Sequence, residues 1–328
     1  MIVPSKLKRG DGIRVIAPAR SLSLLSEEIF RAALDRLGDL GFRVSFSEHA
    51  KENDMFMSSS VASRVEDIHA AFRDTDVKGI LTVIGGFNSN QLLDSLDYDL
   101  IRENPKVLCG FSDITALCNA ITAKTGLVTY SGPHFSTFAI RRGFEYDLEY
   151  FSKCLMEEGE YRVEPSERWS DDAWYLDQES RDFIGNEGYA VLNPGRAEGR
   201  IVGGNLCTLN LLHGTPYMPD LSGAVLFLED DGDTGGNFAV EFDRNLQSLI
   251  HQPGFDGVRG VVIGRPQKSS NMNTEKFRYI IGTKEAFRNI PVVVGADFGH
   301  TDPLFTFPIG GTARLVAGEG VSIFVTEH

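Results

Sequence analysis

Three side chains of complementary chemistry stand shortly after apolar, strand-like runs of the sequence. These are Ser112, Glu229 and His300. A hydroxyl, a carboxylate and an imidazole form the set that a nucleophilic hydrolase needs as nucleophile, orienting acid and general base. Because functional groups gather where the strands of an open α/β sheet end, these three positions are the leading candidates for an active site.

Ser112 lies between a predicted strand at 106–110 and a predicted helix at 113–125. A serine on such a turn exposes its Oγ, and the N–H group that follows it can face a developing oxyanion. The match to the G-x-S-x-G pattern is incomplete, because Ile114 replaces the second glycine. The alternative is that Ser112 only caps the helix.

Glu229 follows the apolar run 224–228. A carboxylate beside a buried strand is costly unless it is paired, which favours a role in orienting a histidine. The alternative is an exposed acidic turn shared with Asp230, Asp231 and Asp233. Their spacing does not fit a calcium-binding EF-hand loop, and we expect no metal site.

His300 follows Gly299 in a loop after a predicted strand. An unperturbed pKa of about 6.5 suits a histidine to general-base catalysis. His134 is the rival base. A cysteine hydrolase using Cys109 or Cys118 is a further alternative, but these residues fall inside a predicted strand and a predicted helix, where we expect them to be buried.

Gly85 and Gly86 end the predicted strand at 79–84. Consecutive glycines after a strand leave backbone N–H groups free to hold a phosphate or an oxyanion. The segment is neither G-x-G-x-x-G nor a Walker loop, which argues against dinucleotide and nucleoside triphosphate sites. The alternative is a tight turn capped by Asn88 or Ser89.

The first half of the chain alternates apolar runs with helical patterns. This alternation predicts a parallel sheet with helices on both faces. We expect strands at 13–17, 44–46, 79–84 and 106–110, and helices at 24–40, 91–96 and 113–125. The serines at 58–60 are expected to cap a further helix that runs through Ile68 to Phe72.

The second half repeats this alternation after an irregular, polar stretch that contains Trp169 and Trp174. We therefore predict an N-terminal α/β domain over 1–156, an inter-domain crossing over 157–198 and a C-terminal α/β domain over 199–328. In the last part we expect strands at 199–202, 224–228, 258–263 and 291–296, helices near 205–212, 237–250 and 274–288, and a hairpin of 313–316 with 321–325.

Length and composition narrow the function classes. A chain of 328 residues predicts two domains, and 46 acidic against 32 basic residues give a net charge of −14. This balance argues against nucleic acid and anionic membranes as partners, but allows a small-molecule substrate. With no signal peptide, no apolar run of about 18 residues and no C-x-x-C pair, we expect a cytoplasmic protein without a membrane span or cofactor.

These segments together resemble the LD-carboxypeptidase family of serine peptidases, in its branch of microcin C immunity proteins. The matching pieces are spread over nearly the whole chain, in the family's order: IRVIAPA, GGFNSNQLL, GFSDITAL, GRIVGGNLCTL, LFLEDDG and GADFGHTDP. The resemblance implies an N-terminal parallel-sheet, Rossmann-like α/β domain and a smaller C-terminal α/β domain, with the active site in the cleft between them. It also implies a homodimer.

The resemblance assigns a role to each candidate. Ser112 is the implied nucleophile, His300 the general base and acid, and Glu229 the orienting carboxylate. The implied oxyanion hole consists of the backbone N–H groups of Asp113 and Gly86.

Two segments bear on the substrate. Phe87 and Asn88 follow the glycines where murein-trimming relatives usually have Tyr-Gly, and WSDDAWYLDQ resembles the immunity-protein loop whose tryptophan stacks on a nucleobase. Such stacking contributes about 1–3 kcal/mol per base. We expect Phe87, Asn88 and Trp174, with Trp169 as the alternative tryptophan, to bind substrate; both tryptophans pinning the loop to the surface is the plainer interpretation.

The expected substrate is an aminoacyl- or peptidyl-nucleotide, cleaved at its amide-type acyl bond. The first alternative is a murein tetrapeptide that loses its terminal D-alanine through the same triad. An alternative of another class is a nucleotide-binding module without catalysis.

Overall fold

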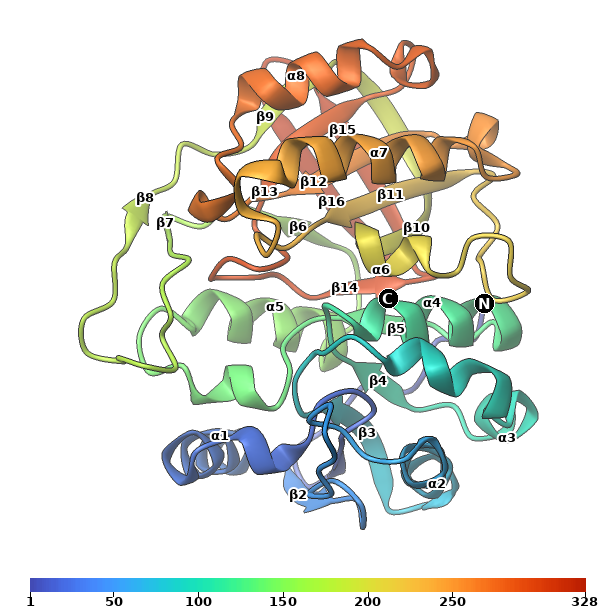
Figure 1. Cartoon of the computed structure of the whole chain (residues 1–328), viewed down its shortest axis with the longest axis vertical. Helices are drawn as coiled ribbons and strands as arrows, with labels where there is room; N and C mark the ends of the chain where they lie inside the picture. The colour runs from blue at the N-terminus through green and yellow to red at the C-terminus, as the bar shows by residue number, and fades with distance from the viewer.

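The computed structural model describes all residues 1–328 and arranges them in two α/β lobes, each built on its own sheet (Figure 1). The first sheet has the strand order β14-β5-β4-β3-β1-β2. Its strands are β1 (Gly12–Ile16), β2 (Arg43–Phe46), β3 (Val77–Thr82), β4 (Val107–Cys109), β5 (Thr129–Ser131) and β14 (Phe307–Ile309). The first five run parallel, and β14 pairs with β5 in the antiparallel sense.

Helices follow the strands of the first lobe, as strand–helix alternation predicts. They are α1 (Glu27–Asp39), α2 (Val61–Arg73), α3 (Tyr98–Glu103), α4 (Ile114–Thr125) and α5 (Glu145–Leu155). Ser26 and Ser60 cap α1 and α2 by accepting N–H bonds from Ile29 and Ser63. The helices expected at 24–40 and 91–96 are shorter or tighter than predicted, because 22–24 and 89–95 form 3-10 turns.

The second sheet has eight strands in the order β6-β16-β15-β10-β11-β12-β13-β9. Its parallel centre comprises β10 (Gly195–Asn205), β11 (Ala224–Glu229), β12 (Gly260–Gly264) and β13 (Val292–Ala296). The antiparallel strands are β6 (Tyr161–Val163), β9 (Ala190–Asn193), β15 (Thr312–Ala317) and β16 (Val321–Glu327), of which the last two form the predicted terminal hairpin.

Three helices accompany this sheet: α6 (Leu206–Asn210), α7 (Phe238–Ile250) and α8 (Thr274–Gly282). The helix expected over 274–288 is wrong at its end. It stops at Gly282, and a separate 3-10 turn covers Glu285–Phe287. Glycine is a poor interior helix residue, which accounts for the break.

The two sheets exchange strands along the chain. β14 comes from the last part of the sequence but pairs in the first sheet, and β6 and β9 come from the 157–198 crossing but pair in the second. The expected division of the chain at residues 156 and 198 therefore does not coincide with the division of the strands between the two sheets. No helix of the structure has the length and apolar character needed to cross a membrane.

The predicted fold class is confirmed: a parallel-sheet α/β lobe comes first and a second α/β lobe follows it. In the first sheet, chain order reverses between β1 and β3, which are parallel neighbours. Loops after the carboxyl ends of strands from both sheets meet around one cavity, which contains the sequence-predicted nucleophile and base.

Candidate active site

Ser112, His300 and Glu229 form a continuous hydrogen-bonded chain. Ser112 Oγ lies 3.0 Å from His300 Nε2, and His300 Nδ1 lies 2.8 Å from Glu229 Oε2. Glu229 is the last residue of β11 and is only 3% exposed, whereas Ser112 and His300 are half-buried at the cavity. The two lobes thus bring together a hydroxyl, an imidazole and a buried carboxylate in the order that nucleophilic hydrolysis requires.

The backbone at Ser112 is unusual for a residue with a side chain. Its φ is +60°, in the left-handed region, on the tight turn between β4 and α4. Strained backbone of this kind persists where the surrounding structure enforces it, and it recurs at active sites. The Ser112 hydroxyl faces His300 instead of capping α4, whose N-cap position is occupied by Asp113.

Two free backbone donors line the same cavity as the Ser112 hydroxyl. The N–H groups of Gly86 and Asp113 donate no hydrogen bond within the protein, and both residues line the cavity with Ser112. The adjacent Gly85 allows the close approach, because a Cβ there would lie 3.0 Å from Ser112 Oγ. Free N–H groups beside a nucleophile are the donors from which an oxyanion hole is built.

The Asp113 side chain fixes the glycine loop against the serine turn. Its Oδ2 accepts N–H bonds from Asn88 at 3.0 Å and Ser89 at 2.9 Å, and the Ser89 hydroxyl donates to the Asp113 carbonyl at 2.6 Å. Burial raises the pKa of Asp113, while these hydrogen bonds and the charge of Arg64 oppose the rise. The contacts hold Gly86 and Ser112 in a fixed relation.

Asn88 is expected to bind substrate, but it does not line the cavity that contains Ser112 and His300, which we call the catalytic cavity. Nη1 of the buried Arg64 donates to the carbonyl and to Oδ1 of Asn88, at 3.1 Å each. Asn88 lines a neighbouring cavity instead. Phe87 does line the catalytic cavity and is 70% exposed.

Acidic neighbours set the protonation of His300. Burial lowers the pKa of His300, but the charge of Glu229, its hydrogen bond, and the charges of Asp231 and Asp230 together raise it to about 9. Because its pKa is raised, neutral His300 is a strong acceptor for the proton of Ser112. In the free protein, however, His300 is neutral only at alkaline pH.

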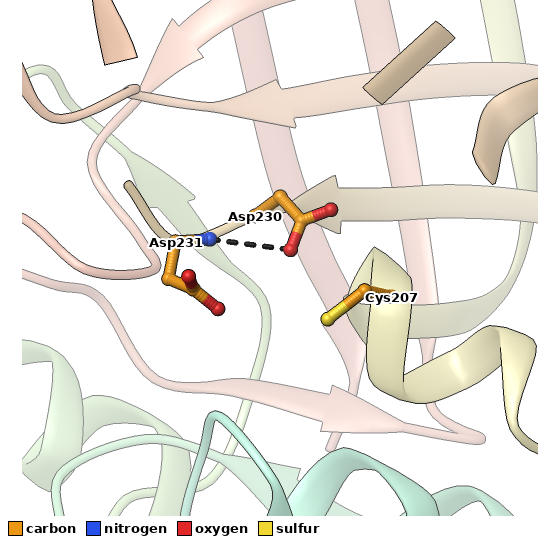
Figure 2. A group of neighbouring side chains, drawn as sticks. All are labelled: Cys207, Asp230 and Asp231. Carbon is orange, nitrogen blue, oxygen red and sulfur yellow. Dashed lines mark hydrogen bonds between the residues drawn. The ribbon is translucent and has the colours of Figure 1, made fainter. Parts of the chain in front are cut away.

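Cys207 in the first turn of α6 faces Asp230 and Asp231, which follow β11 (Figure 2). One ligand atom from each residue lies within 4.8 Å of the others. Burial and the charges of Glu229 and Asp231 raise the pKa of Asp230 to about 7, and burial also raises the pKa of the Cys207 thiol. Metal binding would require both groups to lose their protons, so the cluster is better described as an acidic wall beside His300.

The rival residues have other roles in the structure. His134 is buried with Nδ1 2.7 Å from Thr82 Oγ1, and burial followed by the charge of His300 lowers its pKa to about 3. It lines the cavity but forms no hydrogen bond with Ser112. Cys109 and Cys118 are buried, and burial raises the pKa of both thiols, that of Cys118 to about 12. Thiols in such surroundings are inert.

The catalytic cavity has a volume of about 500 Å³ and contains several residues that sequence reasoning missed. Arg20 follows β1, and Gln267 follows β12. The rule that strand ends carry functional groups would have found these two, but neither lies in a pattern with recognisable chemistry. The other missed lining residues are Cys207, Thr208 and Leu211, whereas Asp231 and Asp233 belong to the acidic turn that the sequence indicates after Glu229.

Neither predicted tryptophan lines the catalytic cavity. Trp169 lines an adjacent cavity of about 470 Å³, which shares Gln267 with the catalytic one, and the Arg265 guanidinium lies 5.0 Å from the Trp169 ring centre. Trp174 is half-buried and contacts Tyr175 edge to face. The structure therefore places Trp169, not Trp174, in a cavity next to the catalytic one.

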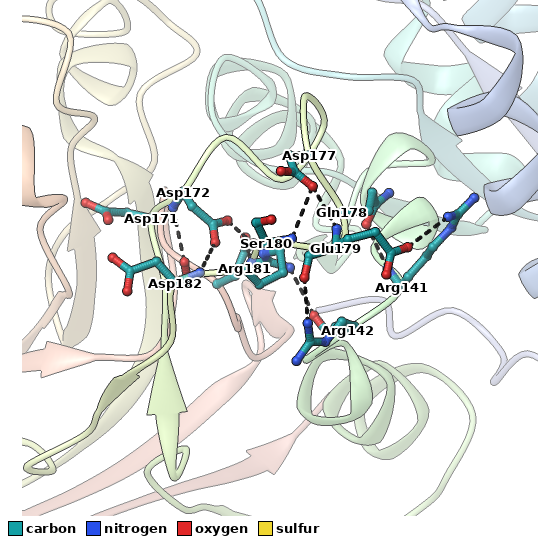
Figure 3. Close-up of polar contacts among 12 residues, drawn as sticks. Arg141, Arg142, Asp171, Asp172, Asp177, Gln178, Glu179, Ser180, Arg181 and Asp182 are labelled. Atoms are coloured by element: carbon teal, nitrogen blue, oxygen red, sulfur yellow. Dashed lines mark hydrogen bonds and ion pairs between the residues drawn. The ribbon is translucent and has the colours of Figure 1, made fainter.

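A buried arginine anchors the loop that carries both tryptophans (Figure 3). Arg181 has a fully buried side chain that contacts Asp172 at 2.7 Å, Asp302 at 3.1 Å and the Arg142 carbonyl at 2.9 Å. Ser170 and Asp302 also exchange two backbone hydrogen bonds. Because Asp302 follows His300 by two residues, the tryptophan loop and the His300 loop are held as one unit.

Comparison with known sequences agrees with this architecture. The model of the LD-carboxypeptidase N-terminal domain matches residues 13–132, and that of the C-terminal domain matches residues 198–315. The putative carboxypeptidase YocD of Bacillus subtilis is 53% identical over 99% of both chains. The microcin C7 self-immunity protein MccF of Escherichia coli is 30% identical, covering 100% of this chain and 96% of its own. A probable murein peptide carboxypeptidase of Bacillus subtilis is also 30% identical, covering 98% and 93%.

Solved structures show the same fold over the whole chain. An MccF-like protein from Bacillus anthracis superposes with a TM-score of 0.99 at 55% identity, covering 100% of both chains. MccF in complex with aspartyl sulfamoyl adenosine gives a TM-score of 0.89 at 28% identity, covering 100% of this chain and 99% of that one. The two domain models span most of the sequence and the fold agrees throughout, so the chain belongs to the LD-carboxypeptidase family of serine peptidases.

Proposed function

We propose that this chain is a serine hydrolase with a Ser112–His300–Glu229 triad that cleaves the acyl, amide-type bond of aminoacyl- or peptidyl-nucleotides. The observation that carries the proposal is the hydrogen-bonded chain from Ser112 Oγ through His300 to Glu229 at a cavity of about 500 Å³. A cavity of this size matches small-molecule sites.

In the proposed mechanism, His300 Nε2 takes the proton of Ser112 as Oγ attacks the substrate carbonyl carbon. Glu229 stabilises the imidazolium that forms, and the N–H groups of Gly86 and Asp113 receive the oxyanion. When the tetrahedral intermediate collapses, the bond to the leaving group breaks and His300 returns the proton to that group. Water, deprotonated by His300, then attacks the acyl carbon. As the bond from that carbon to Ser112 Oγ breaks, His300 returns the proton to the serine oxygen.

A nucleotide conjugate is supported as substrate by a relative and by an aromatic group near the site. MccF is described in complex with aspartyl sulfamoyl adenosine, an aminoacyl-nucleotide analogue. In this chain, Trp169 in the cavity next to the catalytic one offers a ring face for a nucleobase. The affinities of the variants Trp169→Ala and Trp174→Ala for adenosine monophosphate identify the tryptophan that stacks on the base. The variant that lacks this tryptophan should bind roughly 5- to 100-fold more weakly than the unmodified chain.

A substrate panel tests the proposal. The purified chain is offered an aminoacyl sulfamoyl adenosine and an L,D-linked murein tetrapeptide, with Ser112→Ala as the control protein. We expect release of the amino acid and of sulfamoyl adenosine by the unmodified chain alone. Turnover of the tetrapeptide only would make the protein a D-alanine-releasing carboxypeptidase. Nucleotide binding without turnover of either compound would make it a binding module.

A further inference from the structure

A second cavity lies beside the catalytic one and has no part in the proposed chemistry. It has a volume of about 570 Å³ and shares Arg20 and Phe87 with the catalytic cavity. Arg20 follows β1, and Phe87 follows β3. The parallel strands β1 and β3 are neighbours and flank the place where chain order reverses in the first sheet. Ligands of open α/β sheets bind at such places.

Arg20 is a cation without an anionic partner. Its half-buried guanidinium donates no hydrogen bond within the protein, and no carboxylate oxygen lies within 4.0 Å of it. The guanidinium lies over the Phe87 ring, 5.1 Å from the ring centre. A guanidinium offers five N–H donors in a planar fork that fits a carboxylate or a phosphate, and this fork lies where the two cavities join.

The neighbouring Arg64 does not share this property. It is buried, and its Nη1 and Nη2 donate to Pro18, Asn88 and Gln91. Arg64 therefore shapes the wall of the second cavity, whereas Arg20 has its donors free for a ligand.

The rim of the second cavity is apolar and strongly exposed. Met55 is 86% exposed, Phe56 is 69% exposed and Phe87 is 70% exposed. The loop that carries the first two is held by Asp54, whose Oδ1 accepts N–H bonds from Phe56 at 2.8 Å and Ser58 at 3.0 Å. A cluster of exposed apolar side chains at the edge of a cavity is typical of a binding surface.

We propose that the second cavity is a substrate subsite. It binds the end of the acyl part that lies far from the cleaved bond, with a carboxylate or phosphate on Arg20 and an apolar group on Met55 and Phe56. This inference rests on the proposed function, because the subsite would bind a further part of the same substrate whose acyl bond Ser112 attacks. The ligand chemistry is a carboxylate or phosphate within reach of an apolar side chain. An N-terminal acidic or phosphorylated residue on a peptidyl-nucleotide supplies it.

The test compares matched peptidyl sulfamoyl adenosines that differ only in the N-terminal residue. One pair carries Glu or Gln, and the other carries phosphoserine or Ser. We expect the unmodified chain to favour the anionic member of at least one pair by about 5- to 50-fold in kcat/KM, and the preferred pair distinguishes carboxylate from phosphate. In Arg20→Met the ratio falls to about one, and rising ionic strength lowers it in the unmodified chain.

Arg31→Met is the matched control, because Arg31 is an exposed arginine of α1 that pairs only with Glu27. It removes the same charge from the chain and keeps the preference. Equal preference in Arg20→Met and the unmodified chain, or no preference in either pair, overturns the subsite.

The same conjugates are then titrated onto Ser112→Ala, which measures the preference without turnover. Anion-dependent binding with no hydrolysis by the unmodified chain supports the subsite and refutes the proposed function. Hydrolysis without any anion preference refutes the subsite and leaves the proposed function standing.

Discussion

The Glu229 carboxylate packs directly against the backbone of Gly299. A Cβ added at residue 299 would lie 2.5 Å from Glu229 Oε2, and the φ of Gly299 is +105°. Only glycine combines this backbone conformation with so close an approach. Gly299 therefore lets Glu229 reach the Nδ1 atom of the adjacent His300.

We predict that Gly299→Ala lowers kcat/KM by about 100-fold, because the displaced carboxylate no longer orients His300. Gly159→Ala is the matched control: Gly159 has a φ of +96°, but a Cβ there would meet nothing within 4 Å. The control carries the same backbone strain, about 1 kcal/mol, and keeps its activity. Equal activity of the two variants in steady-state assays would show that the contact with Glu229 has no catalytic importance.

The raised pKa of His300 predicts an alkaline activity profile. The general base acts only when neutral, so kcat/KM should increase with pH, with the midpoint of the rise at about pH 9. Glu229→Gln removes the largest influence that raises this pKa, so the midpoint should move to lower pH while the plateau falls by about 10²- to 10⁴-fold. Asp230→Asn should move the midpoint in the same direction by a smaller amount. A pH–rate profile whose midpoint is the same in all three proteins would mean that His300 is not the titrating base.

The fully buried Arg181 should stabilise the fold through its two half-buried carboxylate partners. Arg181→Met leaves Asp172 and Asp302 without their cation, which costs about 3–5 kcal/mol in the free energy of unfolding. Adding Asp302→Asn should recover part of the loss, because one of the unpaired acids is then removed. The measurement is urea unfolding of the single and double variants.

Arg142→Met is the control for that experiment, since Arg142 is exposed and its side chain bonds only the Glu179 carbonyl. We expect it to change the free energy of unfolding by less than about 0.5 kcal/mol. A similar small effect in Arg181→Met would mean that the ion pairs of Arg181 do not stabilise the tryptophan loop.

The sequence predicts the site residues best where they stand at or just after an apolar run that forms a strand. Ser112 and His300 follow buried strands and Glu229 ends one, and such strands appear as apolar runs that need no long-range information. The strand expected at 291–296 is found at Val292–Ala296, which leaves His300 in the loop that follows it.

What the sequence does not show depends on contacts between distant segments. β14 is three residues long, and its pairing with β5 has no local signal. The placement of Trp169 at a cavity next to the catalytic one, and of Trp174 against the hydrophobic core, likewise depends on long-range contacts such as those of Arg181 with their loop. Arg20 is another such case, because its importance comes from lacking a partner in the folded chain.

The most direct test of the central claim is the rate at which Ser112→Ala hydrolyses an aminoacyl sulfamoyl adenosine. We predict that kcat falls by at least about 10⁴-fold, while the nucleotide conjugate still binds and the unfolding midpoint is preserved. Hydrolysis by Ser112→Ala at a rate comparable to that of the unmodified chain would contradict the account, because the acyl group would then be transferred without the serine hydroxyl.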